Sequence, residues 1–84
     1  MNNYLISSNL AISDNGFLFM SSTGETFTVN EIGKHILNEM KNRTDIEKIR
    51  EKILEEYEVS EQILEKDLND FLNQLNTYKL VEEI

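Results

Sequence analysis

The chain has 84 residues, no cysteine, and 16 acidic against 8 basic side chains, for a formal net charge of −8. This length predicts one domain, over residues 1–84, and the lack of cysteine excludes disulfides and thiolate metal sites and favours a reducing, cytoplasmic location. The acidic balance, which also serves solubility, argues against nucleic acid and anionic membranes as partners, because both bind clustered Lys and Arg.

The first part of the chain predicts a β-hairpin. Apolar residues are frequent in segment 4–12, and Asn15-Gly16 follows it. Asn-Gly favours a two-residue hairpin turn because both central residues take positive φ. The return strand, 17–20, is an unbroken apolar run, which predicts a central strand covered on both faces.

A third strand is predicted at residues 25–29, after a second turn around Gly24. Polar and apolar residues alternate here, so Phe27 and Val29 are expected to face inward and the threonines outward. An up-and-down order places this strand at the edge of the sheet, where it is open to further pairing. The strands together span about residues 4–29.

Three helices are predicted in the remaining chain, at about residues 31–41, 45–57 and 61–76, because apolar residues recur there at helical spacing. The third helix has the most regular stripe. Thr44 and Glu47 have the spacing of a capping box at the start of the second helix. The other expected N-caps are Asn30 and Ser60.

The C-terminal residues Tyr78, Leu80, Val81 and Ile84 form an apolar tail that either folds back onto the core or frays. No apolar stretch approaches the ~20 residues needed to cross a bilayer, and the N-terminal segment has no signal-peptide pattern, so we expect a soluble, unprocessed protein. The predicted fold class is α+β: a small winged helix-turn-helix-like domain, with a three-stranded antiparallel sheet followed by three helices.

No motif for catalysis, metal binding or nucleotide binding is found. His35 is the only histidine, and without a second histidine or a cysteine it forms neither a catalytic group nor a zinc site. The acidic pair Asp67 and Asp70 matches an ordinary solvated helix face, and no glycine-rich phosphate loop occurs. We expect no enzyme activity, no metal and no cofactor.

The segment GETFTVNEIGKHIL, residues 24–37, resembles the PqqD family of peptide chaperones, the recognition elements for ribosomally made precursor peptides. A second part of the resemblance is Tyr57 and Val59 followed by the apolar and acidic positions of the third helix. Together the two parts cover roughly residues 10–81. One departure is Asn42-Arg43, where the family commonly has Asp-Gly. The matching residues are Gly24, Phe27, Val29-Asn30, Gly33, Ile36-Leu37, Tyr57, Val59, Asp67, Phe71-Leu72 and Leu75.

This resemblance implies a non-catalytic module that binds the leader of a precursor peptide and delivers it to a modifying enzyme. The pathway that the resemblance implies is peptide natural product synthesis, such as that of lasso peptides, or PQQ-type synthesis, and the implied enzyme is a leader peptidase or a radical SAM enzyme. The leader is expected to add as a strand to the third strand and to lie toward the third helix. The expected contact residues are Glu25, Thr26, Phe27, Thr28, Val29, Leu64, Asp67, Leu68 and Phe71.

The open edge strand supports the same conclusion without the resemblance, because unpaired backbone groups are a template for an incoming strand. Each apolar contact residue is equally well interpreted as part of the core. Asp67 either faces solvent or meets a leader Lys, Arg or backbone N–H.

Two alternative functions remain. A general protein-interaction adaptor would use the same edge, whereas a winged-helix DNA regulator is less favoured because the third helix is acidic. A monomer or a weak edge-to-edge homodimer is expected. The charged residues of that helix are Glu61, Glu65, Lys66, Asp67 and Asp70.

Overall fold

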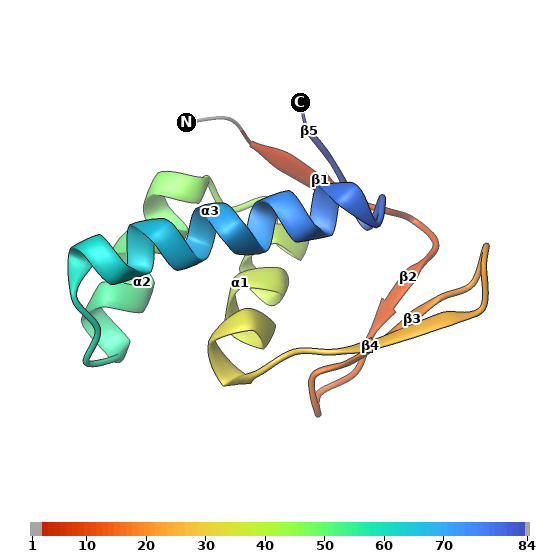
Figure 1. Cartoon of the computed structure of the whole chain (residues 1–84), viewed down its shortest axis with the longest axis horizontal. Coiled ribbons are helices and arrows are strands. Elements are labelled where there is room, and N and C mark those ends of the chain that lie inside the picture. Colours follow the sequence, from red (N-terminus) through yellow and green to blue (C-terminus); the bar gives the residue numbers. More distant parts are fainter. Residues whose placement is uncertain (1–2, 84) are drawn as a thin grey trace.

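A computed structural model describes residues 3–83 of the chain (Figure 1). Strands β2, β3 and β4 form an antiparallel sheet in that order, and the three helices follow, so the predicted α+β fold class is confirmed. No helix of residues 3–83 is long and apolar enough to cross a membrane. The elements are β1 (Tyr4–Ile6), β2 (Leu10–Ile12), β3 (Phe17–Met20), β4 (Glu25–Thr28), α1 (Glu31–Lys41), α2 (Ile46–Glu56), α3 (Glu61–Thr77) and β5 (Val81–Glu83).

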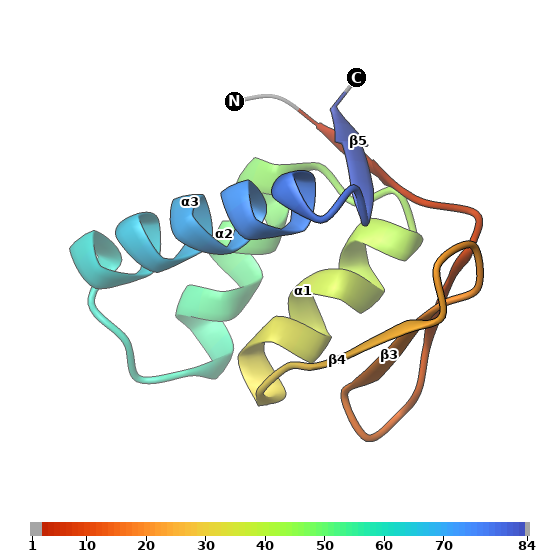
Figure 2. The same ribbon diagram turned by 45° about the vertical axis from the view of Figure 1, so that its right-hand side comes forward.

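The helices pack together and cover one face of the sheet. In Figure 1, α3 runs across α1 and α2, and Figure 2 shows β4 leading directly into α1. Arg50 of α2 contacts two glutamates of α3, with Nη1 lying 3.0 Å from Glu61 Oε1 and 3.5 Å from Glu65 Oε2. The most deeply buried side chains come from sheet, helices and tail alike: Leu18, Leu37, Ile46, Ile49, Ile53 and Val81.

The turn between β2 and β3 differs from the prediction. Ser13 N–H donates to Phe17 O at 2.9 Å, so the loop has three residues rather than two. Within this loop only Gly16 has a positive φ, 79°, and Asn15 does not. The Ser13 hydroxyl oxygen stabilises this wider loop by accepting from the N–H groups of Asn15 and Phe17.

Strand β3 is central, but the prediction that both its faces are covered was wrong. Leu18 and Met20 are buried at 1% and 6% exposure, whereas Phe17 and Phe19 are 47% and 42% exposed. The helices lie on one face of this small sheet, and successive side chains of a strand point to opposite faces. The outer face of β3 therefore stays in contact with water.

The predicted long first strand, 4–12, is two strands separated by a turn at Ser7 to Asn9. Strand β1 leaves the main sheet and pairs antiparallel with β5, so the tail folds back onto the core. Leu80 and Val81 are each only 2% exposed. The remaining predicted tail residue, Ile84, lies outside the described residues.

The start of α2 also differs from the prediction. Asp45, not Thr44, is its N-cap and accepts from Glu47 N–H at 3.2 Å. Thr44 belongs to the end of α1, where its N–H donates to Glu39 O and its hydroxyl donates to Glu39 Oε1. This pattern, with Arg43 at φ 63°, is a Schellman motif in which Arg43 takes the left-handed position that glycine favours.

Candidate functional site

Strand β4 is an edge of the main sheet. Val29 N–H donates to Gly16 O, toward β3, and hydrogen-bonding direction alternates along an antiparallel strand. The backbone groups of Phe27 therefore also point toward β3, whereas those of Thr26 and Thr28 point away from it. No strand within residues 3–83 pairs with that outer side.

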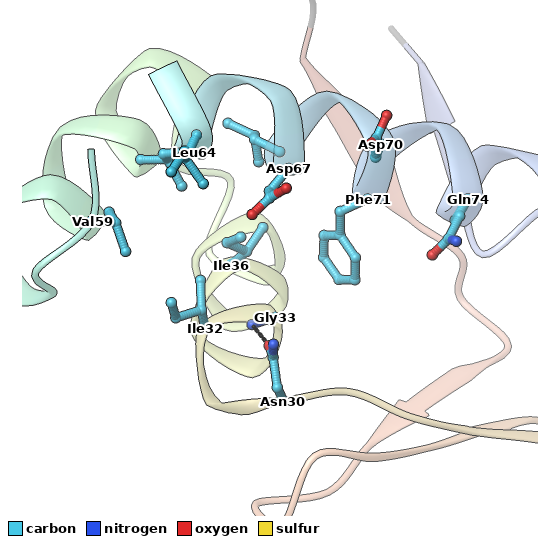
Figure 3. A pocket seen from close by; sticks show the side chains of 12 residues that line it. Asn30, Ile32, Gly33, Ile36, Val59, Leu64, Asp67, Asp70, Phe71 and Gln74 are labelled. Carbon is cyan, nitrogen blue, oxygen red and sulfur yellow. Dashed lines mark hydrogen bonds between the residues drawn. The ribbon is translucent and has the colours of Figure 1, made fainter. Parts of the chain in front are cut away.

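A groove runs from this edge strand to the space between α1 and α3, and Figure 3 shows the side chains that line its end between the helices. It consists of a larger pocket of about 280 Å³ and a smaller one of about 80 Å³ next to β4, and they adjoin because Phe71 and Gln74 line both. The larger pocket is lined by Asn30, Ile32, Gly33, Ile36, Val59, Ile63, Leu64, Asp67, Leu68, Asp70, Phe71 and Gln74. The smaller is lined by Leu18, Phe27, Thr28, Val29, Phe71, Gln74, Leu75, Tyr78 and Leu80.

Helix α1 supplies the tightly packed floor of the groove. The side chain of Asn30 caps the helix, with Oδ1 accepting from Gly33 N–H at 2.8 Å. A β-carbon on Gly33 would lie only 3.1 Å from Val29 Cβ and 3.4 Å from Phe71 Cζ. Glycine thus allows the end of β4, the start of α1 and the Phe71 ring to meet.

The nine expected contact residues are distributed unevenly in the structure. Seven line the groove, whereas Glu25 and Thr26 lie on β4 but line neither pocket. Both interpretations hold for Leu64 and Leu68, because these side chains are only 5% and 2% exposed, as core residues are, and they also line the groove. The seven are Phe27, Thr28, Val29, Leu64, Asp67, Leu68 and Phe71.

Sequence reasoning missed several groove residues on α3, although a pattern indicates them. The missed residues Ile63, Asp70 and Gln74 recur at helical spacing with the expected contact Asp67 and form a second stripe beside the core stripe. Ile63 is 61% exposed, which is unusual for a large apolar residue placed just outside a core stripe. The other groove residues that were not among the expected contacts are Leu18, Asn30, Ile32, Gly33, Ile36, Val59, Leu75, Tyr78 and Leu80.

The charged side chains lining the groove, Asp67 and Asp70, are both acidic. Lys66 Nζ lies 3.1 Å from Asp70 Oδ2. Asp67 makes no hydrogen bond or ion pair with any of residues 3–83, and Figure 3 shows its carboxylate directed from α3 toward α1. The groove therefore combines apolar walls with negative charge at its rim.

A second polar cluster joins α1 to α2 away from the groove. His35 lies between two carboxylates, with Nε2 3.6 Å from Glu39 Oε2 and Nδ1 3.5 Å from Glu56 Oε2. Hydrogen bonds from the Thr44 hydroxyl and the Lys52 ammonium lower the pKa of Glu39. These contacts give His35 a structural role, because its ring joins Glu39 of α1 to Glu56 of α2.

The family profile described as coenzyme PQQ synthesis protein D (PqqD) matches residues 16–81, most of the chain. The chain belongs to the PqqD family. This PqqD-family chain is also similar to the solved structure of TbiB1 in complex with the TbiA(beta) leader peptide, at 31% identity and a TM-score of 0.82. That match covers 93% of this chain and 94% of the other.

A second structure, of lasso peptide synthetase B1 complexed with its leader peptide, has the same fold with a TM-score of 0.82. Its identity to the PqqD-family chain is 17%, and the match covers 95% of this chain and 98% of that one. A comparison with curated proteins gave no match. The family predicted from residues 24–37 and from the spacing of the later motif is thus confirmed.

Proposed function

We propose that this chain is a non-catalytic recognition module that captures the leader of a ribosomally synthesised precursor peptide and delivers it to a modifying enzyme. The observation that carries the proposal is the open edge of β4 beside the groove between α1 and α3. An added strand would place its backbone on the edge and its alternate side chains in the groove.

The edge and the groove supply different parts of the recognition. The outward backbone groups of Thr26 and Thr28 provide two donors and two acceptors, which any peptide sequence can satisfy. The pockets on either side of Phe71 are mainly apolar and limited in volume, so they discriminate between leader side chains by shape. Affinity and selectivity thus come from adjacent parts of one surface.

The comparison with TbiB1 supports this proposal, because that protein was solved with a leader peptide and resembles this chain over nearly its whole length. The modifying enzyme is, in our proposal, a leader peptidase or a radical SAM enzyme encoded beside this chain's gene. Holding the leader raises the effective concentration of the peptide at that enzyme. Adding the chain in trans should accelerate that enzyme's action on the full precursor and leave a leaderless core peptide unaffected.

The direct test is titration of isotope-labelled protein with a leader peptide encoded in the same gene cluster, followed by amide NMR. Shifts are expected in β4 and along the groove side of α3. Shifts confined to the outer surface of α2, or no binding of any leader from the cluster, would contradict leader capture and favour the general adaptor function.

Thr28→Pro tests strand addition itself. Its N–H points to the open edge and takes no part in the β3–β4 ladder, so proline removes a donor for the leader while the fold is retained. We expect leader binding to weaken about three- to tenfold or more, with a smaller effect on folding. Thr28→Val, which retains the N–H, is the matched control, and equal losses in both variants would contradict pairing at this edge.

A further inference from the structure

Asp67 is an exposed carboxylate at the rim of a mainly apolar pocket, and it makes no hydrogen bond or ion pair with any of residues 3–83. The side chains around it in the pocket include Ile36, Leu64 and Leu68. Lys66, the nearest cation in sequence, is bonded to Asp70 and reaches Asp67 only through longer-range attraction. Within residues 3–83, no lysine or arginine lines this pocket.

A strand added to β4 would direct side chains toward the groove in which Asp67 lies. Backbone N–H groups of an added strand lie in the plane of the sheet and point alternately toward β4 and away from it, whereas side chains stand out from that plane. Helix α3 lies on the groove side of β4, where Phe71 contributes to both pockets. The peptide groups that face β4 pair with Thr26 and Thr28, and a side chain on the groove side of the added strand is the group that extends toward α3 and Asp67.

The bound peptide also changes the surroundings of Asp67 by excluding water from the groove. A carboxylate that loses water beside apolar side chains raises the free energy of the complex unless a donor replaces the water. A cationic side chain replaces it best, because charge-assisted hydrogen bonds are stronger than neutral ones. A peptide with an acidic residue there is rejected by repulsion as well.

We propose that this module reads a cationic, amphipathic leader: an apolar side chain fills the larger pocket, and a lysine or arginine on the same face of the strand pairs with Asp67. This inference rests on the proposed function and specifies its ligand. Residues on one face of a strand are two apart, about 7 Å along the chain, so the two features occur at a fixed offset in the sequence.

The first experiment is selection from an mRNA-displayed library of random linear 16-residue peptides against the immobilised full chain. Peptides enriched on the natural chain should share an apolar position and, at one constant offset, lysine or arginine. On Asp67→Lys the basic preference should vanish and acidic residues should replace it at that offset. Glu51→Lys is the matched control, because it makes the same charge change at an exposed residue of α2 that lines neither pocket, and it should leave the preference intact.

The second experiment is a reciprocal exchange with one selected peptide, synthesised with lysine or glutamate at the offset position. The natural chain should bind the lysine form about fivefold or more tightly than the glutamate form, and Asp67→Lys should invert this order. Circular dichroism of each variant checks that the fold is retained.

The outcomes distinguish a failure of the role proposed for Asp67 from a failure of leader capture itself. Enrichment of apolar positions without a basic preference, or a preference that is unchanged on Asp67→Lys, overturns the role of Asp67 and leaves leader capture standing. Failure to enrich any peptide, together with no binding of a leader from the gene cluster, overturns the proposed function itself.

Discussion

Gly16 and Gly24 have nearly the same backbone conformation in different surroundings. Their φ values are 79° and 78°, in the left-handed region that disfavours side chains. A β-carbon on Gly16 would lie 2.7 Å from the carbonyl oxygen of Val29, whereas one on Gly24 would have no heavy atom within 4 Å. The first glycine thus permits both a turn and a close approach of the segment that follows β4, and the second permits only a turn.

This difference predicts unequal effects of alanine at the two positions. Gly24→Ala should lower the free energy of unfolding by about 1–2 kcal/mol, the usual conformational penalty. Gly16→Ala should lower it by at least about 1 kcal/mol more, because a backbone oxygen must move. Urea denaturation of both variants measures the difference, and equal losses would show that the Val29 contact relaxes freely.

At the scale of elements, β3 is amphipathic even though its sequence is entirely apolar. The inner side chains are buried, whereas Phe17 and Phe19 face water. Both outer phenylalanines lie opposite threonines of β4, since Phe17 pairs with Thr28 and Phe19 with Thr26. Burial, rather than residue type, therefore decides how much each side chain of this strand contributes to stability.

We expect Leu18→Ala to cost about 2–5 kcal/mol, as for a fully buried leucine. Phe19→Ala should cost about 1 kcal/mol or less, although it removes a larger side chain, because the ring is already partly in water. Thermal or urea unfolding of the two variants provides the comparison. A cost for Phe19→Ala equal to that of Leu18→Ala would mean that the outer face of the sheet is covered in solution.

At the scale of the whole molecule, Glu39 connects three segments. It is on α1, accepts from Thr44 in the connection to α2, and accepts from Lys52 of α2 at 3.0 Å. Because its pKa is lowered in the folded protein, its ionised form contributes stability above its ordinary value of 4.5, and that contribution is lost as the pH falls through the folded pKa.

The comparison with Glu39→Gln isolates this contribution from the other acidic groups. The natural chain should be more stable than the variant at neutral pH, and the difference should shrink as the pH is lowered below about 4.5. Denaturation with urea at a series of pH values measures it. A difference independent of pH would show that the hydrogen-bonding shape of residue 39, and not its charge, holds α1 to α2.

Much of the fold is encoded locally and could be predicted. Apolar residues at helical spacing and the caps Asn30 and Ser60 define α1 and α3, because a helix satisfies its backbone groups within a few residues. Phe27 and Val29 are partly buried and the neighbouring threonines exposed, as the alternation at residues 25–29 predicted. The family motif was likewise readable from residues close together in the chain.

The candidate site was only partly predictable, because it depends on which helix faces lie together. The stripe of Ile63, Asp67, Asp70 and Gln74 is visible in the sequence, but only the packing of α3 against α1 makes it a groove wall. Asp67 was singled out as either a leader contact or a solvated acid. Its place on the pocket rim gives it the surroundings on which its proposed role rests.

The sequence by itself determined the three helices, the alternation of the third strand and the family, since each depends on interactions between near neighbours. Tertiary structure alone decided that β1 pairs with β5, that the outer face of β3 meets water, and that two pockets join beside β4. Those outcomes depend on contacts between residues up to about eighty positions apart, such as Tyr4 and Glu83, where no local pattern specifies the partner.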